Sequence, residues 1–163
     1  MRDAVGGIVN IWIIAVFMVL VSGYLAFAIQ YNKAFRMKNE IIEALEQCDG
    51  YETAASQSCT DQLIDSYIKQ IGYSVGKWNW SECQSSSDCV DKGEKGYYIK
   101  QRGCVNSTDH GTSVYYTVAT TVNTDIPVFR NLIPNMSLFQ VTGNTRRITI
   151  NIDRRDIFEC NSS

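Results

Sequence analysis

The sequence predicts an α+β fold in which a long N-terminal transmembrane and stalk helix packs on a small antiparallel β-sheet domain with disulfides. Three observations support this prediction: a charge-free run of 29 residues near the N-terminus, segments of alternating hydrophobicity in the second half, and six cysteines that all follow the run. The 163 residues suffice for one ordinary domain beside the helix. We therefore divide the chain into the helix, residues 1–48, and an extracytoplasmic α+β domain, residues 49–163.

The charge-free run extends from Ala4 to Asn32 and exceeds the roughly 20 apolar residues that cross the hydrocarbon of a bilayer as a helix. Trp12 lies near one end, and Tyr24 and Tyr31 lie toward the other. This placement is typical of the aromatic side chains that mark membrane interfaces. We therefore expect the run to cross a membrane and to contact lipid.

A cleaved signal peptide is the alternative, because Ala26-Phe27-Ala28 matches the small-residue pattern of a cleavage site. A signal peptide also has a positively charged start. Arg2 is the only basic residue before the run, and Asp3 offsets its charge. We therefore interpret the run as a retained anchor.

Small residues within the run would let a second helix approach closely. We expect them to form a helix-assembly face, made of Gly6, Gly7, Ala15, Ser22, Gly23 and Ala26.

Helical periodicity continues beyond the run, because apolar residues recur at spacings of three and four: Ala34, Met37, Ile41, Ala44, Leu45 and Cys48. Arg36 and Glu40 lie one turn apart on the polar side, and Gly50 is a plausible stop. The helix is thus expected from about Ala4 to Cys48 and would be about 67 Å long. Its second half should stand outside the membrane, with the domain packed on its apolar stripe.

A second helix is expected from Thr60, as N-cap, to Gly72. The polar stretch from Trp78 to Gly96 is typical of a surface loop. A first strand is expected over Tyr97 to Cys104.

A second, longer strand is expected over Val114 to Val122. Because both of its faces are partly apolar, it should be central, with one face against the stalk helix. Leu138 to Thr142 and Thr145 to Asp153 flank Gly143-Asn144, which predicts a β-hairpin.

The six cysteines permit 15 pairings, and the sequence alone does not choose among them. Proximity along the chain favours Cys48 with Cys59 and Cys83 with Cys89, which leaves Cys104 with Cys160. Three disulfides indicate an oxidising compartment and therefore a domain outside the cytoplasm. The basic residues Lys33, Arg36 and Lys38 after the run favour the opposite orientation. We give the cysteines more weight.

The sequence gives no indication of an enzyme. Its one histidine, His110, lies among turn-forming residues, and the usual nucleophile, phosphate and metal motifs are absent. Asp88, Asp91 and Glu94 do not follow the EF-hand pattern, so we expect a solvated acidic loop there. We expect no cofactor and no metal, and the net charge of −2 argues against nucleic acid as a partner.

The segment from Ile8 to Leu45, an apolar helix that continues as an amphipathic stalk into a disulfide-bearing β domain, resembles the type IV pilin and pseudopilin superfamily. The segments 125–129 and 139–146 are similar to the C-terminal part of TadE-like, pilus-associated membrane proteins of bacteria. The resemblance implies storage in the membrane, followed by side-by-side packing of the helices with copies of the chain or other pilin-like subunits.

The expected function is therefore a structural subunit, pilin-like or a minor pseudopilin, of a bacterial surface filament or secretion-type pilus. The alternative is a single-pass, membrane-anchored extracellular binding module that does not polymerise. A third possibility is a secreted enzyme released by cleavage after Ala28.

Overall fold

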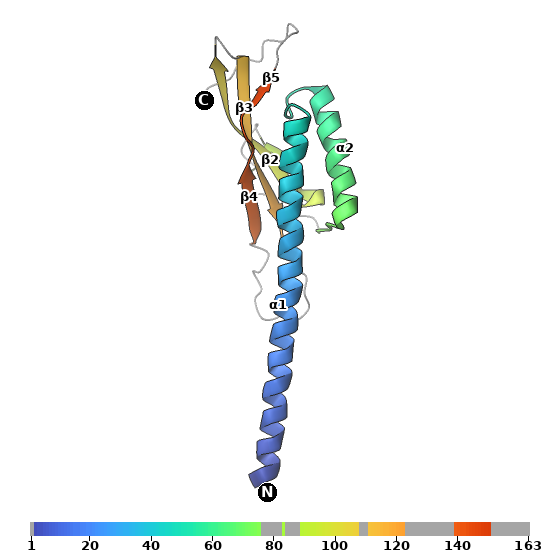
Figure 1. The fold of residues 1–163 in the computed structure, drawn as a ribbon, viewed down its shortest axis with the longest axis vertical. Helices are drawn as coiled ribbons and strands as arrows, with labels where there is room; N and C mark the ends of the chain where they lie inside the picture. The colour runs from blue at the N-terminus through green and yellow to red at the C-terminus, as the bar shows by residue number, and fades with distance from the viewer. Residues whose placement is uncertain (1, 76–82, 84–88, 108–110, 123–138, 151–163) are drawn as a thin grey trace.

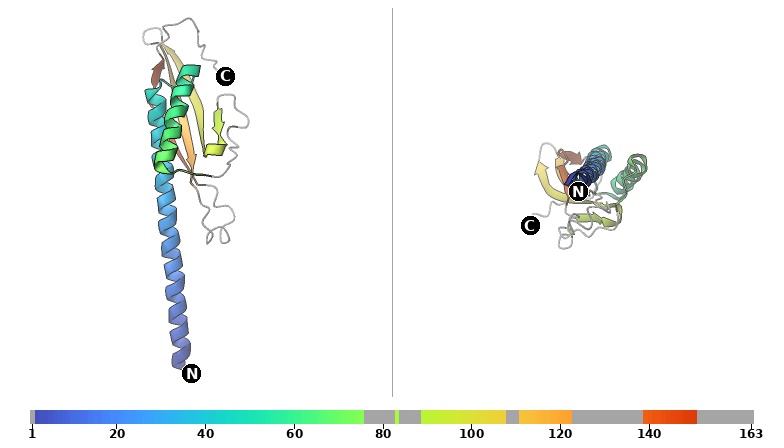
Figure 2. Two further views of the ribbon diagram at one scale, coloured as in Figure 1. Left: turned by 90° about the vertical axis from the view of Figure 1, so that its right-hand side faces the viewer. Right: turned by 90° about the horizontal axis from the view of Figure 1, so that it is seen from below.

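The computed structural model describes residues 2–75, 83, 89–107, 111–122 and 139–150. Within these ranges the chain is an α+β protein with two helices on one face of an antiparallel sheet (Figures 1 and 2). The elements are α1 (Arg2–Gln47), α2 (Ala54–Ile71), β1 (Cys89–Lys92), the short 3-10 helix η1 (Gly93–Lys95), β2 (Tyr97–Ser107), β3 (Gly111–Thr121), β4 (Gln140–Asn144) and β5 (Ile148–Ile150).

Helix α1 is continuous over 46 residues. Its N-terminal half projects beyond the domain, and its C-terminal half lies against the sheet (Figure 1). The predicted apolar stripe faces the domain, because Ala34, Met37, Ile41, Ala44 and Leu45 are all 0% exposed. The same 3.6-residue period that is visible in the sequence thus places one side of the helix in the core.

The end of α1 is formed by two residues with positive φ, Asp49 at 56° and Gly50 at 97°. The Gly50 N–H donates to the Leu45 carbonyl at 2.8 Å, the bond of a Schellman motif with Asp49 in the left-handed position. Gly50 is also needed for space, since an added β carbon would lie 2.8 Å from the Tyr116 hydroxyl. The predicted stop at Gly50 is therefore correct, although Asp49 shares the turn.

Helix α2 begins at Ala54, so the prediction of Thr60 as its N-cap was wrong. Thr53 is the N-cap, and its side chain and that of Ser56 each accept a backbone N–H of the other residue. Serine in place of the usual Glu or Gln makes this capping box hard to find in a sequence. Thr60 lies inside the helix, where its buried hydroxyl donates to the Gly50 carbonyl at 3.2 Å. Gly72 ends the helix as predicted, with φ 65°.

Strand β3 is central, as predicted, with β2 on one side and β4 and β5 on the other. The predicted loop before Gly96 was wrong over Cys89–Lys92, because these residues form β1 and pair with β2. A four-residue strand has too few alternating positions to stand out in a sequence. Strand β2 continues to Ser107, three residues beyond the predicted end.

The predicted hairpin around Gly143-Asn144 was also wrong. Strands β4 and β5 do not pair with each other: β4 pairs with residues 117–121 of β3, and β5 pairs with residues 112–114. Between them, the Thr145 N–H donates to the Tyr116 carbonyl at 2.9 Å. Gly143 serves a different purpose, since an added β carbon would lie 2.8 Å from Cδ of Lys38 on α1. The glycine lets β4 approach the helix.

The two faces of β3 belong to two clusters. Val114, Tyr116 and Val118 pack with the buried stripe of α1 in the main core, and the Thr120 hydroxyl donates to the Ala34 carbonyl at 2.9 Å. On the other face, Ala119 packs with Tyr98 and with Cys83 and Cys89.

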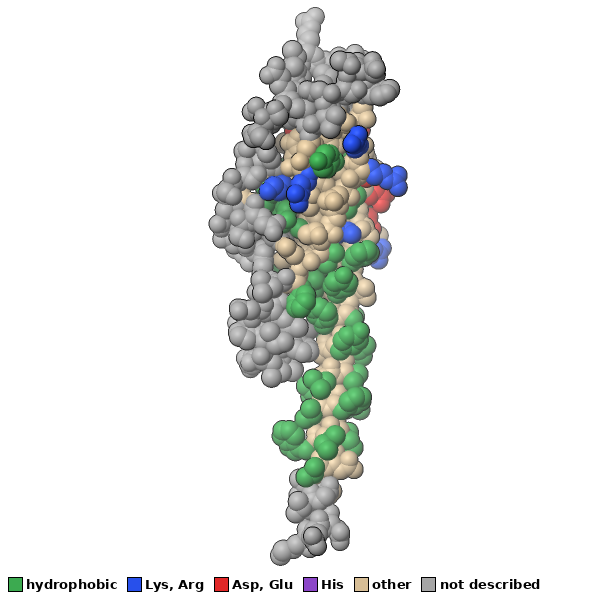
Figure 3. Space-filling model, turned by 90° about the vertical axis from the view of Figure 1, so that its left-hand side faces the viewer, with side chains coloured by type: hydrophobic (Ala, Val, Ile, Leu, Met, Phe, Trp, Pro, Cys, Tyr) green, Lys and Arg blue, Asp and Glu red, His purple; other side chains and the backbone are tan. Residues whose placement is uncertain are grey.

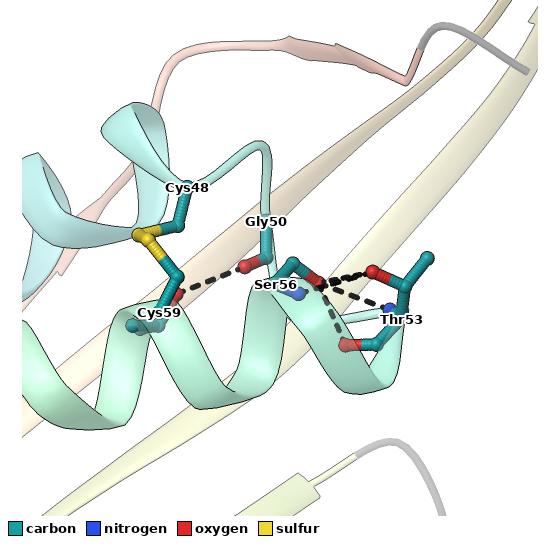
Figure 4. Close-up of a disulfide and its surroundings, with 6 residues drawn as sticks. Cys48, Gly50, Thr53, Ser56 and Cys59 are labelled. Carbon is teal, nitrogen blue, oxygen red and sulfur yellow. Dashed lines mark hydrogen bonds between the residues drawn. A yellow bond between two sulfur atoms is a disulfide. The ribbon is translucent and has the colours of Figure 1, made fainter.

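The described residues contain two disulfides, Cys48–Cys59 and Cys83–Cys89, which are two of the pairs that proximity favours. The third expected pair includes Cys160, which lies outside the described residues, as does His110. Figure 4 shows the first bridge at the turn from α1 to α2. It joins the residue that follows α1 to the first half of α2.

Candidate functional site on helix α1

The projecting segment of α1, residues 9–31, carries exposed apolar side chains on all sides. Large hydrophobic side chains that are 39–70% exposed lie along it: Val9, Ile11, Trp12, Ile13, Ile14, Val16, Phe17, Met18, Val19, Leu20, Val21, Tyr24, Leu25, Ile29 and Tyr31. Figure 3 shows hydrophobic side chains along the face of this segment that it displays. By length and composition, the helix from Val9 is a candidate membrane span, with a mean hydropathy of 2.4 in its most apolar window.

A surface of this size and composition is unusual for a protein in water. Soluble monomers seldom expose contiguous apolar patches of more than a few hundred Å². A helix that is hydrophobic all round is normally covered by lipid or by other protein. The projecting segment is therefore the candidate functional site of the described structure.

The six small residues expected to form an assembly face lie at different angles around α1. At 100° per residue, Ala15, Ser22 and Ala26 fall within about 40° of one another. Gly23 is buried and lies about 60° from Ala26 on one side of these three, and Gly7 lies about 60° from Ser22 on the other. The shared stripe thus consists of Ala15, Ser22 and Ala26.

Ser22 is compatible with apolar surroundings because its hydroxyl is satisfied within the helix. It donates to the Met18 carbonyl at 2.8 Å and lies 3.1 Å from the Val19 carbonyl. A hydroxyl that is hydrogen-bonded to carbonyls of its own helix leaves no unsatisfied polar group in contact with lipid chains.

Two of the three basic residues beyond the projecting segment are used inside the domain. The Lys33 Nζ donates to the Gly72 carbonyl at the end of α2 at 3.4 Å. Lys38 is 9% exposed, and its Nζ lies 4.2 Å from the centre of the Phe35 ring. Only Arg36 points mainly to solvent, with 65% of its side chain exposed, and it pairs with Glu40 at 3.9 Å as predicted.

Aromatic side chains form a group where the projecting segment meets the domain, and we call this group the aromatic collar. It consists of Tyr24, Phe27, Tyr31 and Phe35 of α1 together with Phe139 at the start of β4. The Phe27 and Phe139 rings are edge-to-face with centroids 5.4 Å apart, and the Phe27 and Tyr31 centroids are 6.3 Å apart. The spacing of the α1 members is visible in the sequence, but the contact with Phe139 is not.

At the opposite end of the domain, the Tyr116 hydroxyl connects the sheet to the turn between the helices. It accepts the Tyr51 N–H at 3.1 Å and donates to Oε1 of Glu52 at 2.7 Å. Burial, and then the bond to the Glu52 carboxylate, raise the pKa of Tyr116 well above its ordinary value. Nearby, the Tyr51 hydroxyl donates to Asp61 at 3.0 Å, and Lys92 pairs with the same carboxylate at 3.2 Å. These bonds fix the turn.

A cavity of about 180 Å³ lies beside this turn, between α2 and the sheet. It is lined by Tyr51, Glu52, Gln57, Val90, Ile99, Gln101 and Tyr116. Pockets for drug-sized ligands are larger, at roughly 300–1,000 Å³. The lining contains no histidine, cysteine or serine, and no group of metal ligands occurs within the described ranges.

Comparisons with protein family models, with curated proteins and with solved structures found no match to this chain.

Proposed function

We propose that the protein is a structural subunit, pilin-like or a minor pseudopilin, of a bacterial surface filament or secretion-type pilus, and that it has no enzymatic activity. The observation that supports this most is that one unbroken helix has an exposed apolar part and a part that is buried in the domain core. The projecting segment of α1 is exposed and apolar, while residues 34–45 of the same helix are part of the domain core. A domain fixed rigidly to an apolar rod suits side-by-side packing of the rods with the domains displayed outside.

Assembly by this route requires that α1 exchange lipid for neighbouring helices at little cost. Lipid chains are about as apolar as the side chains of the projecting segment, so the exchange loses almost no hydrophobic energy. Close packing then supplies the gain, and it depends on small residues. The stripe of Ala15, Ser22 and Ala26 offers such a surface.

The same proposal places the domain outside the cytoplasm, with α1 as a single membrane span before assembly. The disulfides Cys48–Cys59 and Cys83–Cys89 support this orientation, because such bonds persist in oxidising compartments. The opposing signal from basic residues is weakened, since the Lys33 Nζ donates to the Gly72 carbonyl and Lys38 is buried in the domain.

Substitution of Ala26 by Leu tests assembly without adding charge to the membrane span. In Ala26→Leu, the larger side chain should prevent the close helix approach, so surface filaments sheared from cells should lack the chain while its amount in the membrane is unchanged. Ala28→Leu is the matched control, because Ala28 lies about 160° from Ala26 around the helix and should leave assembly intact.

The competing function, a membrane-anchored binding module that does not polymerise, predicts a different result. The wild-type chain would then be recovered only as detergent-solubilised monomers, and sheared filaments would not contain it. Equal filament incorporation of Ala26→Leu and Ala28→Leu would show that the small-residue stripe is not an assembly surface.

A further inference from the structure

The aromatic collar lies on one side of α1 at the base of the domain. Tyr24, Phe27, Tyr31 and Phe35 follow one another at spacings of three and four residues, which stacks them along the helix. Tyr24 is 68% exposed, Tyr31 43% and Phe35 44%. Phe139 is 46% exposed, although it already contacts Phe27. Four of the five rings are thus exposed, and the partly buried Phe27 contacts both Tyr31 and Phe139.

The start of β4 limits how deeply the domain can enter a bilayer. Figure 1 shows that β4 begins at the end of the sheet nearer to the N-terminus of α1. The Phe139 carbonyl there accepts the Val122 N–H at 2.9 Å, so sheet backbone is present at the level of Phe27. Open sheet edges do not occur in lipid hydrocarbon. The hydrocarbon boundary therefore lies close to Phe27.

This boundary agrees with the length of the projecting segment. About 20 residues, or about 30 Å of helix, fill the hydrocarbon core and lead from Phe27 down to Ile8. Trp12 then lies about 6 Å inside the far boundary, and Arg2 and Asp3 lie outside it. With the boundary placed at Phe27 by the sheet, the charged positions of α1 all lie outside the hydrocarbon.

The side chains around this boundary match the chemistry of a lipid headgroup region. Tyrosine and other aromatic rings are favoured at membrane interfaces. Beyond the rings lies the exposed guanidinium of Arg36, whereas Lys38 is only 9% exposed and its ammonium is held over the Phe35 ring. With the boundary at Phe27, Tyr24 lies about 4 Å inside the hydrocarbon and Tyr31 about 6 Å outside it, which places both rings next to the headgroup region.

We propose that the aromatic collar seats the base of the domain in the headgroup region of the outer leaflet, so that the domain rests on the lipid surface instead of standing clear of it on a stalk. The inference uses the proposed function only in requiring that α1 cross a bilayer before assembly. The seat fixes the depth of α1. When the subunit leaves the membrane, both the aromatic collar and the projecting segment must be withdrawn from lipid.

Quenching of tryptophan by brominated phospholipids tests the seat in the full-length chain. The background variant is Trp12→Phe, Trp78→Phe and Trp80→Phe, reconstituted as one copy per lipid nanodisc. Phe139→Trp then reports the collar. Thr142→Trp is the matched control, because Thr142 is also exposed on β4 and lies about 10 Å further along the strand. Phe17→Trp reports insertion of α1.

The proposal predicts that the tryptophan at position 139 has blue-shifted emission and is quenched by lipids brominated near the headgroup. The tryptophan at position 142 should show neither the blue shift nor the quenching. Quenching at position 17 but not at position 139 would overturn the seat and leave membrane insertion of α1 intact. No quenching at position 17 would overturn insertion and the seat together. Emission at position 139 that shifts only when several copies share a disc would assign the collar to a second copy of the chain, contrary to the proposal.

Discussion

The Tyr116 hydroxyl offers a quantitative test of how the helical turn is held on the sheet. In Tyr116→Phe the ring that packs against the core remains, and only the hydroxyl is lost. The Tyr51 N–H then has no acceptor at 3.1 Å, and Oε1 of Glu52 loses its donor at 2.7 Å. Because Tyr51 is 8% exposed, its N–H has little access to water as a replacement acceptor.

The expected loss of stability follows from these two bonds. A buried donor without a partner costs about 1–3 kcal/mol, and a hydrogen bond to a charged group contributes about 1.5–3 kcal/mol. Glu52 is only partly buried and regains water, so the second contribution is reduced. We therefore expect a loss of about 2–4 kcal/mol, which lowers the Tm of a chain of this size by about 5–12 °C.

The measurement is thermal unfolding of the full chain in detergent, followed by near-UV circular dichroism. Tyr115→Phe is the matched control, because Tyr115 is the neighbouring residue on β3 and its hydroxyl makes no hydrogen bond among the residues that the structure describes. It should unfold within about 0.5 kcal/mol of the wild type. Equal Tm values for the two variants would refute the role assigned to the Tyr116 hydroxyl.

Three further predictions concern the turn between α1 and α2 and the buried Tyr73. Cys48→Ser/Cys59→Ser opens a loop with a sequence separation of 11 and should lower the free energy of unfolding by about 3 kcal/mol; a urea transition unchanged from the wild type would contradict this. Gly50→Ala should lower the free energy of unfolding by about 1–3 kcal/mol, because φ is positive at this position and the added β carbon would contact Tyr116. Gly7→Ala, where an added β carbon meets nothing within 4 Å, serves as its control in the same thermal assay. Burial raises the pKa of Tyr73 to about 12 from an ordinary 10.0, so the neutral hydroxyl is favoured in the folded state. The contribution of the neutral Tyr73 hydroxyl to the free energy of unfolding is complete below pH 10. It is lost as the pH rises toward 12, by up to about 1.4 kcal/mol per pH unit. Urea unfolding at a series of alkaline pH values measures this loss, and a flat profile there would exclude it.

The fold could be predicted from the sequence wherever a short-range pattern decides it. The stripe from Ala34 to Leu45 is visible as helical spacing, and all its members are buried. Cys48–Cys59 and Cys83–Cys89 join cysteines that are close along the chain. In each case the residues that interact are near neighbours in sequence, so their spacing already limits the geometry.

Pairing of strands could not be predicted in the same way. Gly143-Asn144 is a good local turn signal, but β3 is long enough to pair with both β4 and β5 along one edge. The backbone hydrogen bonds formed in the two arrangements are equivalent in kind. The choice between them depends on which arrangement lets β4 pack against Lys38 and Ile42 of α1, and the sequence contains no local record of that contact.

The sequence by itself determined that a long apolar helix continues into a small disulfide-bonded domain, because charge, hydropathy and periodicity are properties of consecutive residues. Only the tertiary structure decided where the domain ends along that helix. Phe27 and Phe139 are 112 positions apart, and their contact sets the level at which sheet backbone begins. Contacts between distant residues depend on the packing of the whole chain, since each partner's local pattern is compatible with many other neighbours.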